Sequence, residues 1–468
     1  MLDLSFDHPS GIPLVDQIVD GVRRRIDDRL LRPGAQLPPI RRFAEHHGVS
    51  RFTVVEAYDR LVALGYAKSR RGAGFFVAPR PAPSRTTAGP IAPERAVDVL
   101  WLLRQGFDNA DNANLKVGSG WLPPEWLDHE GIRRNVRALS RRPDVRLTGY
   151  GIPQGYLPLR QQLQVKLGEL GIAADPRRIV LTHGATQALD LAARYLVKPG
   201  DCVLVDDPGY WTFFGNLRMQ GAQLVGVPRG HDGPDIEALK ALLEQHQPKV
   251  FFTHTVLHNP TATNISPATA HQLLKLAERH DFLIVEDDTY SDFQPGPTTR
   301  LAALDQLDRV IYIGSFSKTL TADLRVGFFT CREDLAAALT DAMLLSSLST
   351  SEFNERLIYS MLVDGHYRKH AERMRGRLAD AMATTLRMLE RVGFEPYAEP
   401  EGGLFVWAKA PALDDAAPLA DAAARAGIML APGNVFRPQM QASPWLRFNV
   451  GFATDPRLER FLAERTET

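Results

Sequence analysis

The stretch Val310-Ile-Tyr-Ile-Gly-Ser-Phe-Ser-Lys318 decides the fold, because a hydrophobic run leads directly into a lysine that follows two serines. Such a short hydrophobic run is typical of a strand that is buried on both faces of a parallel sheet. Similar runs precede it in the chain, at 179–182, 202–205, 250–253 and 282–285. Amphipathic helical patterns lie between these runs, at 186–197, 235–246 and 267–280. This alternation predicts an α/β domain with a mostly parallel sheet.

The pattern changes after about residue 335, where helical periodicity dominates. A long helical stretch covers 351–392, and two late strands fit 403–408 and 446–450. We therefore expect a body over 112–468. Its large part covers about 112–335, and a smaller α+β part covers about 336–468.

Length and composition indicate a soluble protein of several domains. At 468 residues the chain is too long for a single hydrophobic core, and its 44% hydrophobic and 24% charged content is ordinary. No apolar run reaches the roughly 18 residues needed to span a bilayer. Acidic residues stand near the N-terminus, where a secretory signal carries positive charge, so we expect a cytoplasmic protein without membrane contact. The two cysteines, Cys202 and Cys331, predict neither a disulfide framework nor a metal site.

The first eighty residues predict a compact head. Apolar residues recur every four positions over 13–30, which indicates an amphipathic helix. A second short helix fits 39–46, and Ser50 can cap a third helix that runs through Leu64. Short strands at 66–68 and 75–78 then flank a basic hairpin. This order predicts a winged helix-turn-helix, which we place at 11–78.

Charge and proline content separate the head from the body. Residues 1–80 hold thirteen Lys and Arg against nine Asp and Glu, a balance of +4. Because the whole chain is neutral, the remainder carries −4. Five prolines with Ser, Thr, Ala and Gly fill 79–95, which predicts an extended linker over 79–111. A basic head on an acidic body favours a local contact with nucleic acid.

The third predicted helix is the candidate DNA-reading element, because the second helix of a helix-turn-helix enters the major groove. It begins Ser50-Arg51-Phe52-Thr53, and Arg51 can donate two hydrogen bonds to a guanine edge. For any single arginine the alternative is a solvated surface side chain, but the whole spacing favours double-stranded DNA. The residues predicted to bind DNA are Arg41, Arg42, Ser50, Arg51, Thr53, Arg70 and Arg71.

Polar residues follow the predicted strands of the body in an order that suits pyridoxal 5'-phosphate (PLP). This cofactor needs a lysine, an anion site, an acid on the pyridine nitrogen, a donor to the phenolic oxygen and a flat group on the ring. Lys318 is the lysine. Gly184-Ala185-Thr186 opens a helix after a strand, and N–H groups at a helix start bind phosphate. Ser315, Ser317 and Arg325 can complete the phosphate site.

The remaining requirements of the cofactor fall on four further residues. Tyr210 can stack on the pyridine ring, and Asn259 and Tyr290 can donate to the phenolic oxygen. Asp287 can keep the pyridine nitrogen protonated. Singly, each of these has an ordinary explanation in packing or in a turn. As an ordered set they predict PLP as the cofactor.

The head resembles the GntR family of winged-helix repressors over about 11–78. The resemblance rests on Pro33-Gly-Ala-Gln-Leu-Pro-Pro-Ile-Arg41, Gly48-Val-Ser-Arg-Phe-Thr-Val54 and Gly72-Ala-Gly-Phe-Phe-Val77. It implies binding to operator DNA. One departure is Pro39, where the family usually has a serine whose hydroxyl can contact phosphate.

The body resembles the fold-type I PLP aminotransferases from about 112 to 455. The resemblance implies that Arg447, in Leu446-Arg-Phe-Asn-Val-Gly451, binds a substrate carboxylate. It implies that Tyr150, in Gly149-Tyr-Gly-Ile-Pro-Gln-Gly155, reaches the phosphate of the neighbouring subunit. A head-to-tail homodimer follows from that role. The resemblance also places Gly118 and Gly120 at the substrate entrance.

A GntR-like head joined by a linker to such a body resembles the MocR-type transcriptional regulators. The implied function is PLP-dependent regulation in response to an amine or amino acid. A working aminotransferase with an accessory head and a sensor of PLP itself are the alternatives. The spacing Asp287-x-x-Tyr290 is closer to that of active aminotransferases, so residual transaminase activity stays open.

Overall fold

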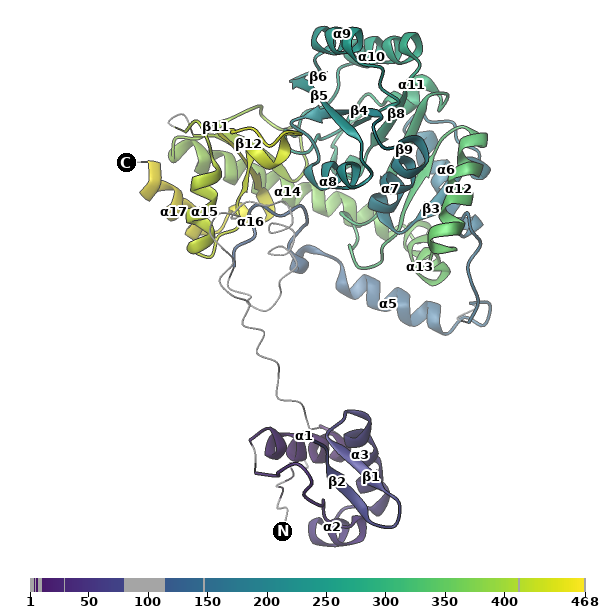
Figure 1. Ribbon diagram of the computed structural model, residues 1–468, viewed down its shortest axis with the longest axis vertical. Coiled ribbons are helices and arrows are strands. Elements are labelled where there is room, and N and C mark those ends of the chain that lie inside the picture. Colours follow the sequence, from purple (N-terminus) through teal and green to yellow (C-terminus); the bar gives the residue numbers. More distant parts are fainter. Residues whose placement is uncertain are drawn as a thin grey trace. The chain divides into compact units, whose positions relative to one another are not determined.

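The computed structural model describes residues 4, 6, 11–28, 30–79, 114–145, 148–410 and 413–466. The chain divides into two compact units, Met1–Ile91 and Ala92–Thr468, which we call the head and the body. Figure 1 shows both units and labels many of their helices and strands. The expected linker lies outside the described residues, apart from Pro79. Within the described ranges, no helix is both long and apolar enough to cross a membrane.

The head consists of three helices and a β-hairpin, as the sequence predicts. Its elements are α1 (Leu14–Asp27), α2 (Ile40–His47), α3 (Arg51–Ala63), β1 (Ala67–Arg70) and β2 (Gly74–Val77). The turn between α2 and α3 needs Gly48, whose φ of +65° lies in the left-handed region. Ser50 caps α3 by accepting a hydrogen bond from the Thr53 backbone N–H at 3.0 Å. Arg70 pairs with Gly74 inside the hairpin strands, so the connecting turn is shorter than predicted.

One face of α3 forms the core of the head. Val54, Ala57, Tyr58 and Leu61 are fully buried, and they pack in one cluster with residues of α1 that include Ile18. These four positions follow the helical repeat, so they form a single stripe. The opposite face of α3 is therefore free to contact a partner.

A mixed eight-stranded sheet forms the centre of the body, in the order β3-β10-β9-β8-β7-β4-β5-β6. The strands are β3 (Ile179–Thr182), β4 (Cys202–Asp207), β5 (Gln223–Gly230), β6 (Gly233–Pro234), β7 (Val250–Thr253), β8 (Leu283–Asp287), β9 (Val310–Ser315) and β10 (Gly327–Thr330). All five strands predicted from hydrophobic runs are present. The additional strands β5, β6 and β10 were not predicted. The run β9-β8-β7-β4-β5 is parallel, and β10 is antiparallel to both of its neighbours.

Alternate residues of the central strands face two separate hydrophobic cores. Phe251 and Ile284 belong to one core, and Phe252 and Val285 belong to the other. This explains the hydrophobic runs of these strands, since helices cover both faces of the sheet. The helical elements of this part are η3 (Pro124–Trp126), α5 (His129–Ser140), α6 (Leu157–Glu169), η4 (Pro176–Arg178), α7 (Gly184–Leu196), α8 (Trp211–Met219), α9 (Ile236–Gln245), α10 (Pro267–His280), η5 (Ser291–Phe293), α11 (Leu301–Asp305) and α12 (Glu333–Ser347).

The predicted helical stretch 351–392 consists of two helices, α13 (Glu352–Val363) and α14 (His366–Arg391). They are separated at Gly365, whose φ is +69°. The smaller part then adds an antiparallel sheet in the order β11-β12-β14-β13. Its elements are β11 (Glu395–Pro396), β12 (Phe405–Lys409), α15 (Ala417–Arg425), β13 (Ala431–Pro432), η6 (Gly433–Phe436), β14 (Trp445–Asn449), α16 (Val450–Ala453) and α17 (Pro456–Thr466).

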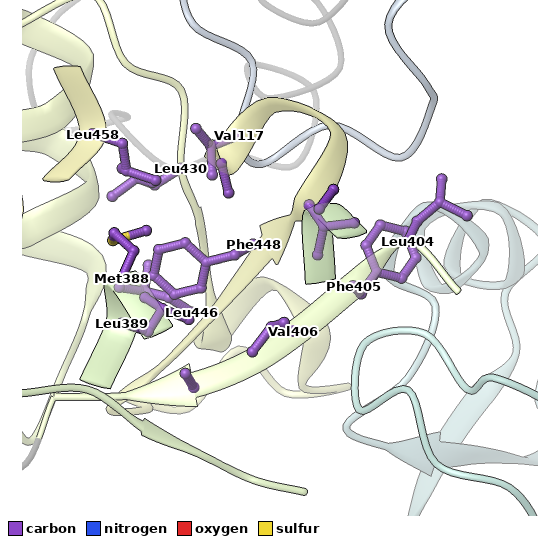
Figure 2. Close-up of a cluster of buried hydrophobic side chains, with 14 of the residues drawn as sticks. Val117, Met388, Leu389, Leu404, Phe405, Val406, Leu430, Leu446, Phe448 and Leu458 are labelled. Carbon is purple, nitrogen blue, oxygen red and sulfur yellow. The ribbon is translucent and has the colours of Figure 1, made fainter. Parts of the chain in front are cut away.

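The smaller part packs around a hydrophobic cluster to which the large part also contributes, and Figure 2 shows this cluster. Val406 of β12 and Phe448 of β14 lie in one cluster with Met388 and Leu389 of α14. Phe405, the neighbour of Val406, belongs to the same cluster and also contacts Arg447. The packing of this sheet therefore fixes the position of one predicted site residue.

Candidate functional site

The predicted cofactor residues meet at one edge of the large sheet. Strands β3, β4, β7, β8 and β9 all point the same way, because β10 is antiparallel to both β3 and β9. Their carboxyl ends share the edge at which open α/β sheets bind ligands. Arg325 reaches the same edge because it precedes β10. The residues at the other strand ends are Gly184, Tyr210, Asn259, Asp287, Tyr290, Ser315, Ser317 and Lys318.

Lys318 directs its amine into the body rather than to the surface. Its Nζ donates a hydrogen bond to the Gly120 carbonyl oxygen at 2.8 Å. Burial lowers the pKa of this amine from 10.5 to about 8, and the positive charge of Arg447 acts in the same direction. A lysine with such a pKa is partly neutral near physiological pH and can act as a nucleophile.

Asp287 is buried and held by two neighbours. One carboxylate oxygen accepts hydrogen bonds from the Thr289 backbone N–H at 3.1 Å and from the Thr289 hydroxyl. The other oxygen lies 3.1 Å from Nε2 of His254. Burial pushes the pKa of Asp287 upward, but His254 and Thr289 outweigh it, so the pKa lies below its usual value. The carboxylate is therefore ionised at neutral pH and can pair with a protonated ring nitrogen.

His254 was not among the predicted site residues, and it links the two predicted tyrosines. Its ring lies 6.0 Å from the Tyr210 ring and 6.3 Å from the Tyr290 ring, measured between centroids. Burial raises the pKa of both tyrosines. Both hydroxyls thus stay protonated and can donate hydrogen bonds. His254 directly follows Thr253, the last residue of β7. A histidine at the end of a predicted strand was the sequence signal that could have identified it.

A buried polar network lies behind His254. Asp206 accepts hydrogen bonds from Arg229 at 3.2 Å, from the Thr253 hydroxyl and from the His254 backbone N–H. Burial raises the pKa of Asp206, but Arg229 outweighs it and the pKa falls to about 2. Asp206, His254 and His258 have the spacing of metal ligands. Arg229 already neutralises Asp206, so this network is better explained as support for His254 than as a metal centre.

Arg447 is a buried cation with incomplete partners. Its Nη1 donates to the Asn259 side-chain oxygen at 2.7 Å, and its Nη2 donates to the Gly118 carbonyl oxygen at 2.6 Å. The guanidinium lies over the rings of Phe405 and Phe436, at 4.3 and 4.9 Å from their centroids. Its Nε has no hydrogen-bond partner among the described residues. Burial lowers the pKa of this guanidinium to about 10.

The N-terminus of α7 forms an anion cradle with Arg325. The guanidinium of Arg325 donates to the His183 carbonyl oxygen at 3.0 Å and lies 3.5 Å from the Ser317 hydroxyl. Gly184 has a φ of +76°, and a Cβ there would lie 2.8 Å from Nη2 of Arg325. Ser315 accepts a hydrogen bond from the Ser317 backbone N–H at 3.1 Å. Free N–H groups, a guanidinium and two hydroxyls suit a phosphate group.

Of the other predicted cofactor residues, Ala185 and Thr186 belong to the cradle, whereas Tyr150 does not. Ala185 and Thr186 occupy the first turn of α7, where Thr186 is exposed. Tyr150 lies apart from the cluster, with 85% of its surface exposed. The contact of Tyr150 with a second subunit stays a prediction. Gly118 and Gly120 do line the site, through their carbonyl contacts with Arg447 and Lys318.

The predicted DNA-binding residues of the head are exposed, apart from the half-buried Thr53. Arg51 and Arg41 both approach Glu45, at 4.0 and 3.0 Å, and all three side chains are exposed. The Ser50 and Thr53 hydroxyls lie 2.8 Å apart. Arg42 and Arg71 are exposed, whereas the Arg70 guanidinium lies 4.6 Å from the centroid of the Phe76 ring. Glu45 was not predicted, and it lies within ion-pair distance of both Arg41 and Arg51.

Comparison with protein families matches both units. Residues 14–77 match the family model of bacterial regulatory proteins of the gntR family. Residues 127–464 match the model of aminotransferase class I and II.

Curated relatives include regulators and enzymes. The HTH-type transcriptional regulator TauR of Rhodobacter capsulatus is 31% identical over 86% of both chains. The probable rhizopine catabolism regulatory protein MocR of Rhizobium meliloti is 29% identical over 83% of this chain and 79% of its own. The 2-aminoadipate transaminase of Thermus thermophilus is 32% identical over 68% of this chain and 81% of its own.

The solved structures give the same fold for the body. Kynurenine aminotransferase of Pyrococcus horikoshii, in complex with PMP, has a TM-score of 0.73 and 27% identity. The match covers 80% of this chain and 94% of the enzyme. Head and body together define a two-part regulator, in which a winged helix-turn-helix is joined to a fold-type I aminotransferase body. The chain belongs to the aminotransferase class I and II family and, with its GntR-family head, to the MocR-type transcriptional regulators.

Proposed function

We propose that this chain binds PLP and responds to an amino acid, or to a closely related amine, by changing how its head binds operator DNA. The observation that carries the proposal is that Lys318 lies close to the buried Arg447. Nε of Arg447 has no hydrogen-bond partner among the described residues. A buried guanidinium without a carboxylate is costly. A ligand carboxylate at Arg447 would relieve that cost and leave the ligand's amino group near Lys318.

The side chains at the sheet edge support PLP as the cofactor. Asp287 offers an ionised carboxylate for the pyridine nitrogen, and the α7 cradle with Arg325 offers an anion site. Tyr290 and the amide N–H₂ of Asn259 offer donors for the phenolic oxygen. When bound, PLP supplies an electron sink for amine chemistry. Lys318 would hold the cofactor covalently, and Tyr210 would lie against its ring.

The proposal includes a head-to-tail homodimer in which Tyr150 of each protomer binds the phosphate held by the other. Support comes from the exposure of Tyr150 at 85% and of Leu345 on α12 at 92%. A cytoplasmic location follows from the proposal, because the head would act on operator DNA.

The proposal is tested by titrating the PLP-loaded protein with amino acids and, in parallel, with the amines that lack only their carboxylate. Absorbance of the cofactor and binding to an operator selected from random duplex DNA are measured on the same samples. We expect some amino acids to change both signals. Arg447→Met should weaken their binding by about ten- to a hundredfold, the worth of a hydrogen bond to a charged group, and leave the amines unaffected. Spectral responses without any change in DNA binding would contradict the regulator.

A working aminotransferase is the second candidate, and two observations favour it. The spacing Asp287-x-x-Tyr290 matches that of active enzymes, and the Thermus transaminase is 32% identical over 68% of this chain. The same samples, supplied with 2-oxoglutarate, distinguish the two. Many turnovers of keto acid per site, without an effect on DNA binding, would establish the enzyme instead.

A further inference from the structure

Phe52 is the exposed aromatic residue of α3. Its side chain is 77% exposed, although it stands in the first turn of the helix. At 3.6 residues per turn, position 52 lies diametrically opposite the buried stripe that contains Ala57 and Leu61. Val55 lies three positions later and is 36% exposed, so it adjoins Phe52 on the same face.

The surroundings of Phe52 are those of a DNA-reading surface. Arg51 precedes it and is exposed, and the hydroxyls of Ser50 and Thr53 lie on either side in the sequence. Exposed apolar side chains that occur singly are common on proteins. Here an aromatic and an aliphatic side chain adjoin at the helix start, where a helix-turn-helix contacts base edges. An apolar side chain in that position cannot satisfy any hydrogen-bonding group of a base.

We propose that Phe52, with Val55 beside it, is a specificity residue that packs against the 5-methyl group of a thymine in the major groove. Thymine alone among the four bases presents a methyl group there, and phenylalanine is suited to contact it. The contact would lie next to the base pair that Arg51 reads. This inference rests on the proposed function, since it requires α3 to enter the major groove.

The test starts from operators that the full-length, PLP-loaded protein selects from random duplex DNA. We expect a thymine adjacent to the guanine assigned to Arg51, and the assignment comes from a parallel selection with Arg51→Ala. That thymine is then replaced by deoxyuridine, which removes only the methyl group. The wild-type protein should bind about three- to fourfold more weakly, the worth of one buried methyl group.

Variants complete a double-mutant cycle. Phe52→Ala should bind the thymine and deoxyuridine operators equally, and its selected sequences should lose the thymine preference. Leu30→Ala is the matched control, because Leu30 is 72% exposed in the head but lies outside α3. It should retain the full methyl effect. Since Phe52 is exposed, its variant should keep the melting temperature of the wild type, which circular dichroism checks.

The outcomes separate this inference from the proposed function. If no sequence is enriched, both fail, because an α3 that reads no DNA has no thymine contact. If a sequence is enriched but the wild-type protein is indifferent to the methyl group, the regulator stands and the role of Phe52 is overturned. The same follows if Phe52→Ala keeps the methyl effect. Capture of a protein partner by Phe52 would appear as unchanged DNA binding in the variant, which likewise overturns the inference.

Discussion

The acid–base chemistry of the body concentrates on Lys318. Burial lowers the pKa of its amine from 10.5 to about 8. Only the neutral amine forms a covalent bond to an aldehyde, and its fraction increases as the pH rises through that pKa. The rate at which Lys318 of the apo protein binds PLP covalently should therefore rise with pH and level off above about 8. Stopped-flow absorbance across a series of buffers measures this profile.

Two variants make the profile specific. Lys318→Ala should yield no adduct after borohydride reduction at any pH, which mass spectrometry checks. Arg447→Met should shift the midpoint of the profile upward, because it removes a positive charge that lowers the pKa of Lys318. A wild-type profile that keeps rising towards the ordinary value of 10.5 would show that the amine is not buried as described.

Residues also show where prediction from sequence ends. Lys318, Asp287 and Asn259 could be placed at the sheet edge because each follows an unmistakable hydrophobic run. His254 could not be assigned, because its role depends on a 3.1 Å contact with Asp287, which belongs to another strand. The approach of Glu45 to Arg51 escaped prediction for the same reason, since Glu45 lies on α2 and Arg51 on α3. Pairings across elements depend on packing, which residue type and spacing do not specify.

At the scale of elements, strands were predictable where both faces are buried. Strand β7 is buried along its whole length and was predicted correctly, whereas β5 contains Gly226 and Pro228, which are unfavourable in strands. Strand β10 is as short as β7, but it runs antiparallel to its neighbours. An antiparallel insertion of this kind does not change the alternation of strands and helices. The fold class was therefore predictable, but the strand order was not.

The start of α7 supports a prediction at the same scale. Gly184→Ala should weaken PLP binding by roughly tenfold, because a side chain at a φ of +76° costs about 1–2 kcal/mol and its Cβ would press on Arg325. Fluorescence titration of the apo protein with PLP measures the change. Gly168→Ala in α6 is the control, since a Cβ there meets no atom within 4 Å. Equal PLP affinities in the two variants would remove α7 from the phosphate site.

At the scale of the whole molecule, the neutral chain combines residues 1–80, of charge +4, with a remainder of charge −4. The basic residues of the head attract the phosphate backbone of DNA, so DNA binding should weaken as the salt concentration rises. On the proposed function, the body converts ligand binding into a different arrangement of two heads, which requires two protomers. A ligand can shift that equilibrium only by its difference in affinity for the two arrangements. The dimer is thus the next feature to test.

Subunit complementation tests whether Tyr150 acts across the dimer. Lys318→Ala and Tyr150→Ala homodimers should each lack high-affinity PLP sites. The first has no amine to bind the cofactor, and the second has no tyrosine hydroxyl to donate a hydrogen bond to its phosphate. In a mixed dimer, the protomer that keeps Lys318 receives Tyr150 from the other. Equal mixing, with refolding or co-expression, should therefore restore about one quarter of the wild-type sites, because half of the dimers are mixed and each holds one native site.

The control for this exchange is Tyr195→Ala, which changes another exposed tyrosine, on α7, with 51% of its surface accessible. That variant should bind PLP as the wild type does. If Tyr150 instead served its own protomer, the mixed dimers would contain no complete site. PLP titration of the mixture would then show no high-affinity sites, because a protomer that keeps Lys318 would always lack its own Tyr150. The two arrangements therefore differ by the presence or absence of a signal rather than by its size.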